Sequence, residues 1–470
     1  MQHTKTMELD PEICYRALST RDPRFDGLFF TGVRTTGVFC RPVCPARTPL
    51  AANCHFFRSA AAALEAGFRP CLRCRPEVAP HLPAANGTSN TVLRALRLID
   101  QGSLDNGNVE DLAARLGIGE RHLRRLFQEE LGASTIAVAQ SRRLLFARQL
   151  IRDTSLPLTD VAFASGFSSL RRFHASFRQS FGCAPRELRR AASSLRGPLT
   201  LKLPFRPPYD WAGLIGFLAR RAIPGIEAAT PQRYRRTFRI GDHIGRVTVA
   251  PSAGNSLTAE IELDQVTPLR EITLRLRRVF DLDADPAVIA THLAELNPPT
   301  GIRVPGAWDA FELAVRAILG QQVSVQAATT LAGRLVAKLG ADLNAPDPPN
   351  RIFPEPSTVA HADLTAIGIP KARAAAISGL ARAIAEKHIV FDSLAHLDEA
   401  VRALKQLTGI GDWTAHYIAM RALSHPDAFP ASDLGLCKAI SLSPVDLERR
   451  SEEWRPWRAY AAMTLWSKLA

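Results

Sequence analysis

Four cysteines near the start of the chain form two closely spaced pairs. Three residues separate Cys40 from Cys44, two separate Cys71 from Cys74, and 26 residues lie between the pairs. Two such pairs suit tetrahedral zinc, which prefers soft thiolate ligands. The first ten residues are polar and contain no secretory apolar segment, so we expect metal ligands or reactive thiols rather than disulfides. The spacing predicts one zinc per chain, with a purely structural zinc as the alternative.

A glycine turn followed by a carboxylate is the second feature that could do chemistry. Gly409 and Gly411 lie in the segment Leu407–Ala415, between two helical segments. Glycines allow backbone N–H groups at a helix N-terminus to approach a phosphate closely. Asp433 follows 19 residues after Thr414. Its carboxylate could serve a reaction, could cap a helix, or could do both.

A helix–turn–helix pattern occurs twice in the first half of the chain. Each copy has an amphipathic helix, a turn containing glycine and a second helix, over Val109–Phe127 and over Leu158–Phe177. The second helix of each copy carries outward-facing basic residues. These are candidate DNA contacts, with solvated surface charge as the alternative for each. They are Arg121, Arg124 and Arg125 in the first copy, and Arg171 and Arg172 in the second.

The composition is that of a globular chain with a basic first part. The chain has 470 residues, of which 46% are hydrophobic and 22% charged, as expected for about three or four globular domains. Residues 1–198 contain 28 Lys/Arg and 17 Asp/Glu, so they carry +11 of the net charge of +14. This excess favours a nucleic acid partner. No apolar run is long enough for a transmembrane helix, and we expect a cytoplasmic protein with no membrane partner.

Two turn-forming segments, at about residues 82–90 and 193–198, delimit the modules. Beyond them, alternating apolar residues and turn signals predict strands, and helical periodicity then holds to the end. We predict a multidomain, mainly α protein with a small α+β domain. Its modules are a zinc module (1–82), a double helix–turn–helix module (88–195), an α+β module (198–282) and a helical module containing the glycine hairpin (283–470). The predicted strands are Leu199–Phe205, Arg233–Ile240, Ile244–Ala250 and Ser256–Leu263.

The cysteine segment closely resembles the N-terminal domain of Ada-type DNA repair regulators, on the strength of Val33–Cys44 and Ala66–Pro76. The resemblance implies that Cys40 is a zinc ligand and also the nucleophile that takes a methyl group irreversibly from a DNA methylphosphotriester. Transfer would remove one negative charge from the cluster, so DNA would be held more tightly. The implied remaining ligands are Cys44, Cys71 and Cys74, and the implied DNA-holding residues are Arg34, Arg41 and Arg47.

Residues 90–192 resemble the AraC-type DNA-binding domain, because the two helix–turn–helix copies are closed by the segment Phe181–Glu187. The resemblance implies promoter DNA and RNA polymerase as partners. Ada-type proteins typically end in a second methyltransferase domain with a Pro-Cys-His-Arg motif. That motif is absent from this sequence, so repair of O6-alkylguanine is not expected.

From about Leu199 to the C-terminus the chain resembles AlkA-type 3-methyladenine DNA glycosylases, which contain a helix–hairpin–helix. The resemblance implies that Asp433 is the catalytic carboxylate and that Gln322 stands where a leucine can wedge into DNA. The hairpin residues Gly409, Gly411 and Thr414 would bind the DNA backbone, with a monovalent cation. The aromatic base pocket would consist of Phe217, Trp413, Tyr417 and Trp466. The matching segments are Pro208–Trp211, Gly216–Leu218, Val304–Gly306, Arg316–Gln321, Gly411–Tyr417 and Trp454–Tyr460.

These residue types fit the chemistry of alkylbase excision. An alkylated purine such as 3-methyladenine is cationic and already a good leaving group, so flipping, aromatic stacking and a carboxylate near the sugar suffice. Glycosylases that also cut the strand carry a lysine two positions after the second hairpin glycine. Here that position is Trp413, so we expect a monofunctional enzyme. The sequence predicts an alkylation-response activator joined to a glycosylase; the alternative is an activator whose glycosylase half only binds DNA.

Overall fold

The computed structural model describes residues 9–82, 90–190, 199–391, 394 and 396–469. Both predicted linkers fall largely outside these residues. The first module packs short helices on a four-stranded sheet of order β3-β1-β2-β4. Strands β2 and β4 run parallel, with Phe39 opposite Pro70. The elements are α1 (Pro11–Thr20), β1 (Phe30–Val33), β2 (Val38–Cys40), β3 (Cys54–Phe57), α2 (Ala60–Glu65) and β4 (Arg69–Pro70).

The second module is helical, and the 19-residue helix α6 connects its two helix–turn–helix units. The first turn follows Gly117, which ends its helix in a left-handed conformation with φ of 73°. Buried Phe127 and Phe173 anchor the second helix of each unit. The elements are α3 (Asn90–Asp100), α4 (Val109–Leu116), α5 (Glu120–Leu131), α6 (Thr135–Asp153), α7 (Leu158–Ala164), α8 (Leu170–Phe181) and α9 (Pro185–Arg190).

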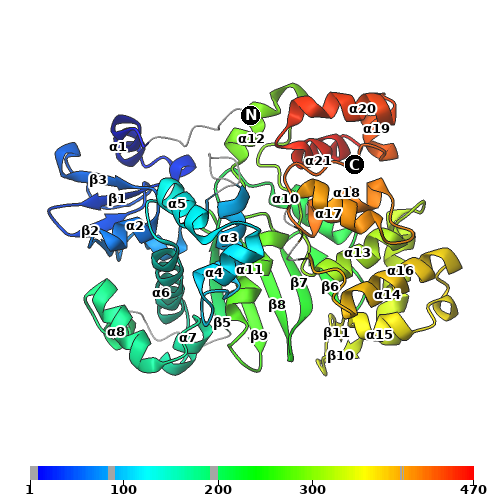
Figure 1. Cartoon of the computed structure of the whole chain (residues 1–470), viewed down its shortest axis with the longest axis horizontal. Coiled ribbons are helices and arrows are strands. Elements are labelled where there is room, and N and C mark those ends of the chain that lie inside the picture. The colour runs from blue at the N-terminus through cyan, green and yellow to red at the C-terminus, as the bar shows by residue number, and fades with distance from the viewer. Residues whose placement is uncertain (1–8, 83–89, 191–198, 392–393, 395, 470) are drawn as a thin grey trace.

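A five-stranded antiparallel sheet of order β5-β9-β8-β7-β6 occupies the centre of the molecule (Figure 1). Each predicted strand of this module is present. Strand β6 was not predicted, because Glu-Ala-Ala-Thr shows no apolar alternation. The elements are β5 (Leu199–Pro204), α10 (Trp211–Ala219), β6 (Glu227–Thr230), β7 (Arg233–Ile240), β8 (His243–Ser252), β9 (Ser256–Leu263) and α11 (Leu269–Val279).

The remaining residues form a helical body beside the sheet (Figure 1). Its apolar side chains form two core clusters, and the α18 residue Tyr417 packs against both. Its helices are α12 (Pro286–His292), α13 (Ala310–Leu319), α14 (Val325–Leu339), α15 (Pro356–His361), α16 (Lys371–Ala385), α17 (Leu397–Lys405), α18 (Asp412–Arg421), α19 (Leu434–Ile440), α20 (Pro444–Ser451) and α21 (Arg458–Ser467), and a two-stranded ribbon pairs β10 (Ala341–Asp342) with β11 (Arg351–Ile352).

The helices of the second module and the central sheet share one hydrophobic core. Leu150 and Phe177 of the helical module belong to the same buried cluster as Leu201 and Val247 of the sheet. Polar contacts reinforce this seam, since Arg270 on α11 donates to the Asp105 carboxylate at 3.0 Å. The connecting helix α6 therefore packs directly on strand β5 of the α+β module, where Gln149 donates to the Lys202 carbonyl at 3.0 Å.

Candidate functional site

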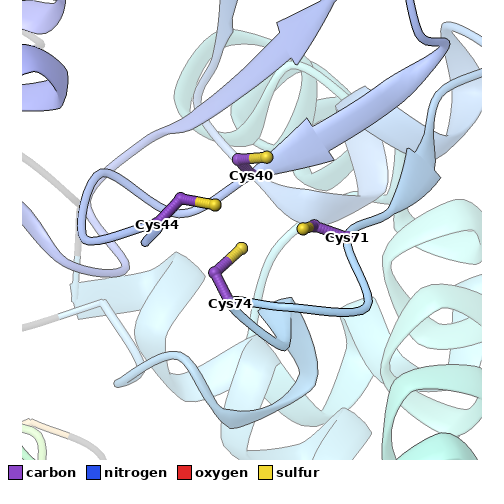
Figure 2. Close-up of side chains that lie close together, drawn as sticks. All are labelled: Cys40, Cys44, Cys71 and Cys74. Atoms are coloured by element: carbon purple, nitrogen blue, oxygen red, sulfur yellow. The ribbon is translucent and has the colours of Figure 1, made fainter. Parts of the chain in front are cut away.

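The four predicted cysteine ligands come together at one end of the first sheet. Their sulfur atoms all lie within 4.8 Å of one another, and the thiol groups point toward a common centre (Figure 2). Cys40 ends β2 and Cys71 follows β4, so the parallel pairing of these strands brings the two pairs together. Cys44, Cys71 and Cys74 are buried, whereas Cys40 is only half-buried.

The cysteine cluster fits a zinc ion. Four soft sulfur donors within 4.8 Å of one another match the ligand set of a tetrahedral zinc site. Two backbone amides also point at the sulfurs: Arg41 N–H donates to Cys74 Sγ and Arg73 N–H to Cys71 Sγ, each at 3.3 Å. Such donors favour the thiolate form that a metal requires.

Helix α6 holds the loop between Cys71 and Cys74 through two arginines. Arg148 donates to the Cys71 carbonyl at 2.9 Å, and Arg152 donates to the Leu72 carbonyl at 3.2 Å. Arg148 is 1% exposed and pairs with Glu77 at 2.7 Å. The cysteine module is thus hydrogen-bonded directly to the helix that joins the two helix–turn–helix units, a connection that no sequence pattern indicated.

The three arginines predicted to hold DNA near the cysteines occupy different environments. Arg34 and Arg47 are exposed. Arg41 is turned inward, where its guanidinium pairs with Asp26 and donates to the Cys74 carbonyl at 3.0 Å. In this structure Arg41 therefore braces the cysteine cluster rather than facing solvent.

The predicted basic residues of the two helix–turn–helix units lie on exposed helix surfaces. Arg121 is exposed on α5, and Arg171 and Arg172 are exposed on α8. Arg124 pairs with Glu120 at 2.5 Å one turn away, and Arg125 lies 3.1 Å from His122. These are solvent-exposed contacts that a phosphate could replace at small cost.

The glycine hairpin between α17 and α18 has two distinct glycines. Gly409 has φ of +86°, and a Cβ there would lie 2.6 Å from the Ala376 side chain, so only glycine fits. Gly411 is the N-cap residue of α18, and a Cβ there would meet nothing within 4 Å. The open side of Gly411 leaves the first N–H groups of α18 accessible to an anion.

Thr414 is buried and is braced by a residue that the sequence analysis did not single out. Gln321 donates from Nε2 to Thr414 Oγ1 at 2.9 Å and to the Gly409 carbonyl at 2.8 Å. The neighbouring Gln322 is exposed and has a left-handed φ of +54°. A non-glycine residue in this conformation carries strain, and it projects the Gln322 side chain from the turn between α13 and α14.

Asp433 is the N-cap of α19, and three N–H groups converge on its carboxylate. Oδ2 accepts from Trp413 Nε1 at 2.8 Å. Oδ1 accepts from Trp466 Nε1 at 3.0 Å and from the Leu436 backbone at 3.0 Å. The sequence left open whether Asp433 caps a helix, serves a reaction, or does both. Its position at the start of α19 is compatible with both roles.

Three of the predicted pocket aromatics lie around this carboxylate. The rings of Trp413 and Tyr417 stack with centroids 5.1 Å apart and planes 9° apart. Trp466 meets Tyr417 edge-on at 6.3 Å. The fourth aromatic, Phe217, is buried and lies under two guanidinium groups, Arg221 at 3.7 Å and Arg421 at 4.8 Å. Sequence reasoning missed both arginines.

No described helix is both long and apolar enough to cross a bilayer.

Four family models match successive parts of the chain. The metal binding domain of Ada matches residues 13–77, and a helix-turn-helix domain matches residues 112–191. The AlkA N-terminal domain matches residues 200–309. The HhH-GPD superfamily of base excision DNA repair proteins matches residues 315–444. Their order is the order of modules that the sequence predicted.

Curated relatives match either the whole chain or one half. The probable bifunctional transcriptional activator/DNA repair enzyme AlkA of Mycobacterium tuberculosis is 43% identical over 98% of this chain and 97% of its own length. DNA-3-methyladenine glycosylase 2 of Escherichia coli is 36% identical over 56% of this chain and 95% of its own. The bifunctional transcriptional activator/DNA repair enzyme Ada of Escherichia coli is 33% identical over 38% of this chain and 49% of its own.

Among solved structures, 3-methyladenine DNA-glycosylase from Archaeoglobus fulgidus is 20% identical, covers 57% of this chain and 97% of its own, and has a TM-score of 0.49. The match along nearly the full length of both chains, at 43% identity, establishes the family. The chain belongs to the family of bifunctional transcriptional activator/DNA repair enzymes that join an Ada-type metal-binding module and a helix–turn–helix module to an AlkA-type helix–hairpin–helix glycosylase.

Proposed function

We propose that the second half of the chain excises alkylated purines such as 3-methyladenine from double-stranded DNA, with Asp433 as the catalytic carboxylate. The observation that carries this proposal is the carboxylate fixed by the indole N–H groups of Trp413 and Trp466 beside a stacked aromatic pair. A fixed anion placed before the reaction is how enzymes stabilise charge that develops in a transition state.

Each of these residues has a place in the reaction. The flipped, electron-poor base stacks on Trp413 and Tyr417. The bond between C1′ and the purine nitrogen breaks, and the electron pair leaves with the base, which needs no proton because alkylation has already made it cationic. Asp433 stabilises the resulting oxocarbenium ion, and water adds to C1′ and gives up a proton. The product is an abasic site in an intact strand.

We propose a monofunctional enzyme, because the lysine that strand-cutting relatives use is replaced by Trp413. Lys405, on the helix before the hairpin, has its ammonium 3.0 Å from the Asp412 carboxylate. The Schiff base that a lyase forms needs a free amine at the reacting sugar, and Trp413 offers none. Borohydride trapping tests this point, and a covalent protein–DNA adduct would show that the enzyme is also a lyase.

We propose that Cys40 accepts a methyl group from a DNA methylphosphotriester. Its sulfur forms the new S–C bond while the methyl C–O bond breaks and the phosphodiester leaves with the electron pair. Cys40 is half-buried, whereas the other three cysteines of the cluster are buried. A zinc bound by Cys40, Cys44, Cys71 and Cys74 would keep these thiols deprotonated.

The first half then acts as a methylation-dependent activator that reads promoter DNA with α5 and α8. The proposed DNA contacts of the first half are Arg34 and Arg47 in the metal module and Arg121, Arg124, Arg125, Arg171 and Arg172 on α5 and α8. Those of the glycosylase half are Gly409, Gly411, Thr414 and Gln322. Four expectations from the sequence stay predictions. They are contact with RNA polymerase, a cytoplasmic location, a monovalent cation at the hairpin, and the domain boundaries at 82, 88, 195, 198 and 282.

Release of free base from methylated double-stranded DNA by the purified chain tests the glycosylase proposal. We expect 3-methyladenine in the soluble fraction and strand breaks only after alkali. Stable DNA binding without release of any base would favour the alternative, in which the second half only binds DNA.

A further inference from the structure

Arg421 lies behind the proposed base pocket, and each of its three guanidinium nitrogens donates one hydrogen bond. Nε donates to the Pro305 carbonyl at 2.7 Å and Nη2 to the Gly306 carbonyl at 3.2 Å. Nη1 donates to the Tyr417 hydroxyl oxygen at 2.9 Å. Arg421 is 4% exposed, so its charge is held in one place and away from water.

This buried cation has no carboxylate partner. Among the described residues, no Asp or Glu lies within ion-pair distance of Arg421 or of the neighbouring Arg221. A third guanidinium, that of Arg316 on α13, pairs with Glu227 at 3.2 Å. Buried charges in proteins are normally paired, and the ionisable group that Arg421 contacts is the phenol of Tyr417.

The arrangement creates a conflict for a pocket that receives cationic purines. Arg221 and Arg421 lie 3.7 Å and 4.8 Å from the centre of the Phe217 ring, so the back of the pocket is positively charged. A cationic base stacked on Tyr417 would be repelled unless a negative group stands between it and these arginines. The Tyr417 oxygen can supply that negative group, since it belongs to the stacking ring itself and accepts a hydrogen bond from Arg421.

We propose that Tyr417 works as a phenolate paired with Arg421, and that this negative group selects purines made cationic by alkylation over neutral purines. The inference rests on the proposed glycosylase function. On ionisation the phenol O–H proton passes to solvent and the negative charge stays on the Tyr417 oxygen. Asp433 keeps its separate task at the sugar.

The electrostatics of the site agree with this assignment. Burial alone raises the pKa of Tyr417, but Arg421, Arg221 and Arg316, together with the Arg421 hydrogen bond, lower it to about 8. A cationic base on the ring would favour the phenolate further. The charged groups on the elements around the ring are Arg421 on α18, Arg221 after α10, Arg316 on α13 with Glu227 on β6, and Asp433 at the start of α19.

Ultraviolet titration of the free full-length protein tests the ionisation without DNA. The chain has five tyrosines, and burial raises the pKa of three of them, Tyr209, Tyr234 and Tyr460. We expect one phenol to ionise at about pH 8 in the parent, against about 10 for an ordinary tyrosine. The step should vanish in Tyr417→Phe and persist in the control Tyr15→Phe, which removes a phenol from the metal module. A Tyr417 phenol that ionises at or above pH 10 overturns the proposal.

Single-turnover excision of two bases tests the selectivity. Tyr417→Phe keeps the stacking ring and removes only the oxygen, so we expect the rate on cationic 3-methyladenine to fall about tenfold or more and the rate on neutral hypoxanthine to fall by a clearly smaller factor. In the parent, the ratio of the two rates should rise with pH through the Tyr417 titration, and in Tyr417→Phe it should stay flat.

The two experiments separate this inference from the function on which it rests. Equal losses on both bases would show that Tyr417 only stacks, and would overturn the selectivity. An ordinary titration in a protein that excises 3-methyladenine overturns the phenolate and leaves the glycosylase standing. A parent protein that excises neither base overturns the proposed function, and the selectivity with it.

Discussion

Replacing Asp433 with asparagine should abolish most base excision while leaving the fold intact. Asparagine has nearly the same shape as aspartate and caps helices equally well, so α19 should keep its N-cap. The change removes the negative charge that would stabilise the cationic sugar. Loss of one well-placed electrostatic group typically lowers a rate by ~10²–10³, and we expect a decrease of that size on 3-methyladenine.

The contacts of Asp433 add a second, structural effect. All three of its neighbours are N–H donors, so a carboxylate satisfies them all and an amide cannot. The amide oxygen should keep the side with two donors, Trp466 and the Leu436 backbone. The amide NH2 would then face Trp413 Nε1 at 2.8 Å, donor against donor. An unmet buried donor costs about 1–3 kcal/mol, so Trp413 should shift and lesion binding should weaken somewhat.

Single-turnover excision and lesion binding, measured on the parent and three variants, separate the two effects. The double variant Asp433→Asn/Trp413→Phe removes the opposing indole donor, so it should recover lesion binding relative to Asp433→Asn but not the rate. Asp309→Asn is the matched control, because Asp309 also caps a helix, α13, by accepting from Glu312 N–H at 3.0 Å. Excision by Asp433→Asn within a few-fold of the parent would refute the catalytic assignment.

Three further predictions follow from the metal module, the hairpin and the seam between the halves. Cys71→Ser should lose the zinc and unfold the first module, because metal binding in such modules is folding free energy; one zinc per chain retained in the variant would contradict this. Gly411→Ala should weaken DNA binding about tenfold or more at unchanged melting temperature, because its Cβ enters the open space that a phosphate would occupy; unchanged affinity would show that no phosphate approaches there. Burial, with Arg97 and Arg458 nearby, lowers the pKa of His425 from 6.5 to about 4. The unfolded chain therefore binds the His425 proton more tightly than the folded chain, so the free energy of unfolding decreases as pH falls from about 6.5 toward 4. We expect a loss of about 1–2 kcal/mol, a figure reduced because the ring is partly exposed to solvent. In His425→Asn the dependence of melting temperature on pH should be flatter over that window, and coincident curves would refute the assignment.

Local spacing predicted the cysteine pairs, the glycine hairpin and the carboxylate after it, because each lies in a short stretch of chain. The aromatic pocket residues followed only from the family resemblance. The cysteine pairs required only that two loops meet, and the parallel pairing of β2 with β4 brings them together. Alternating apolar residues and the turn residues between them predicted strands β7, β8 and β9. Strand β6 did not, because its pairing with β7 depends on the edge it completes rather than on its own sequence, Glu-Ala-Ala-Thr.

Contacts between distant segments could not be predicted in the same way. Nothing near Arg41 in the sequence indicates that Asp26 turns its guanidinium inward. Gln321 braces the hairpin 88 residues away, and Arg148 reaches the metal module from 77 residues along the chain. No pattern in the sequence distinguishes Arg421 from a surface arginine. Its burial against Tyr417 depends on the packing of α10, α13 and α18.

Methylated double-stranded DNA carrying labelled methyl groups tests the central claim, that one chain both senses and repairs alkylation, in a single incubation. The label has two possible destinations, free base released by the Asp433 site and S-methylcysteine formed at Cys40. We predict both, with the protein-bound label confined to the peptide that contains Cys40 and the released label in 3-methyladenine. Label on neither, on only one, or on Cys44 or Cys71 in place of Cys40 would contradict the account.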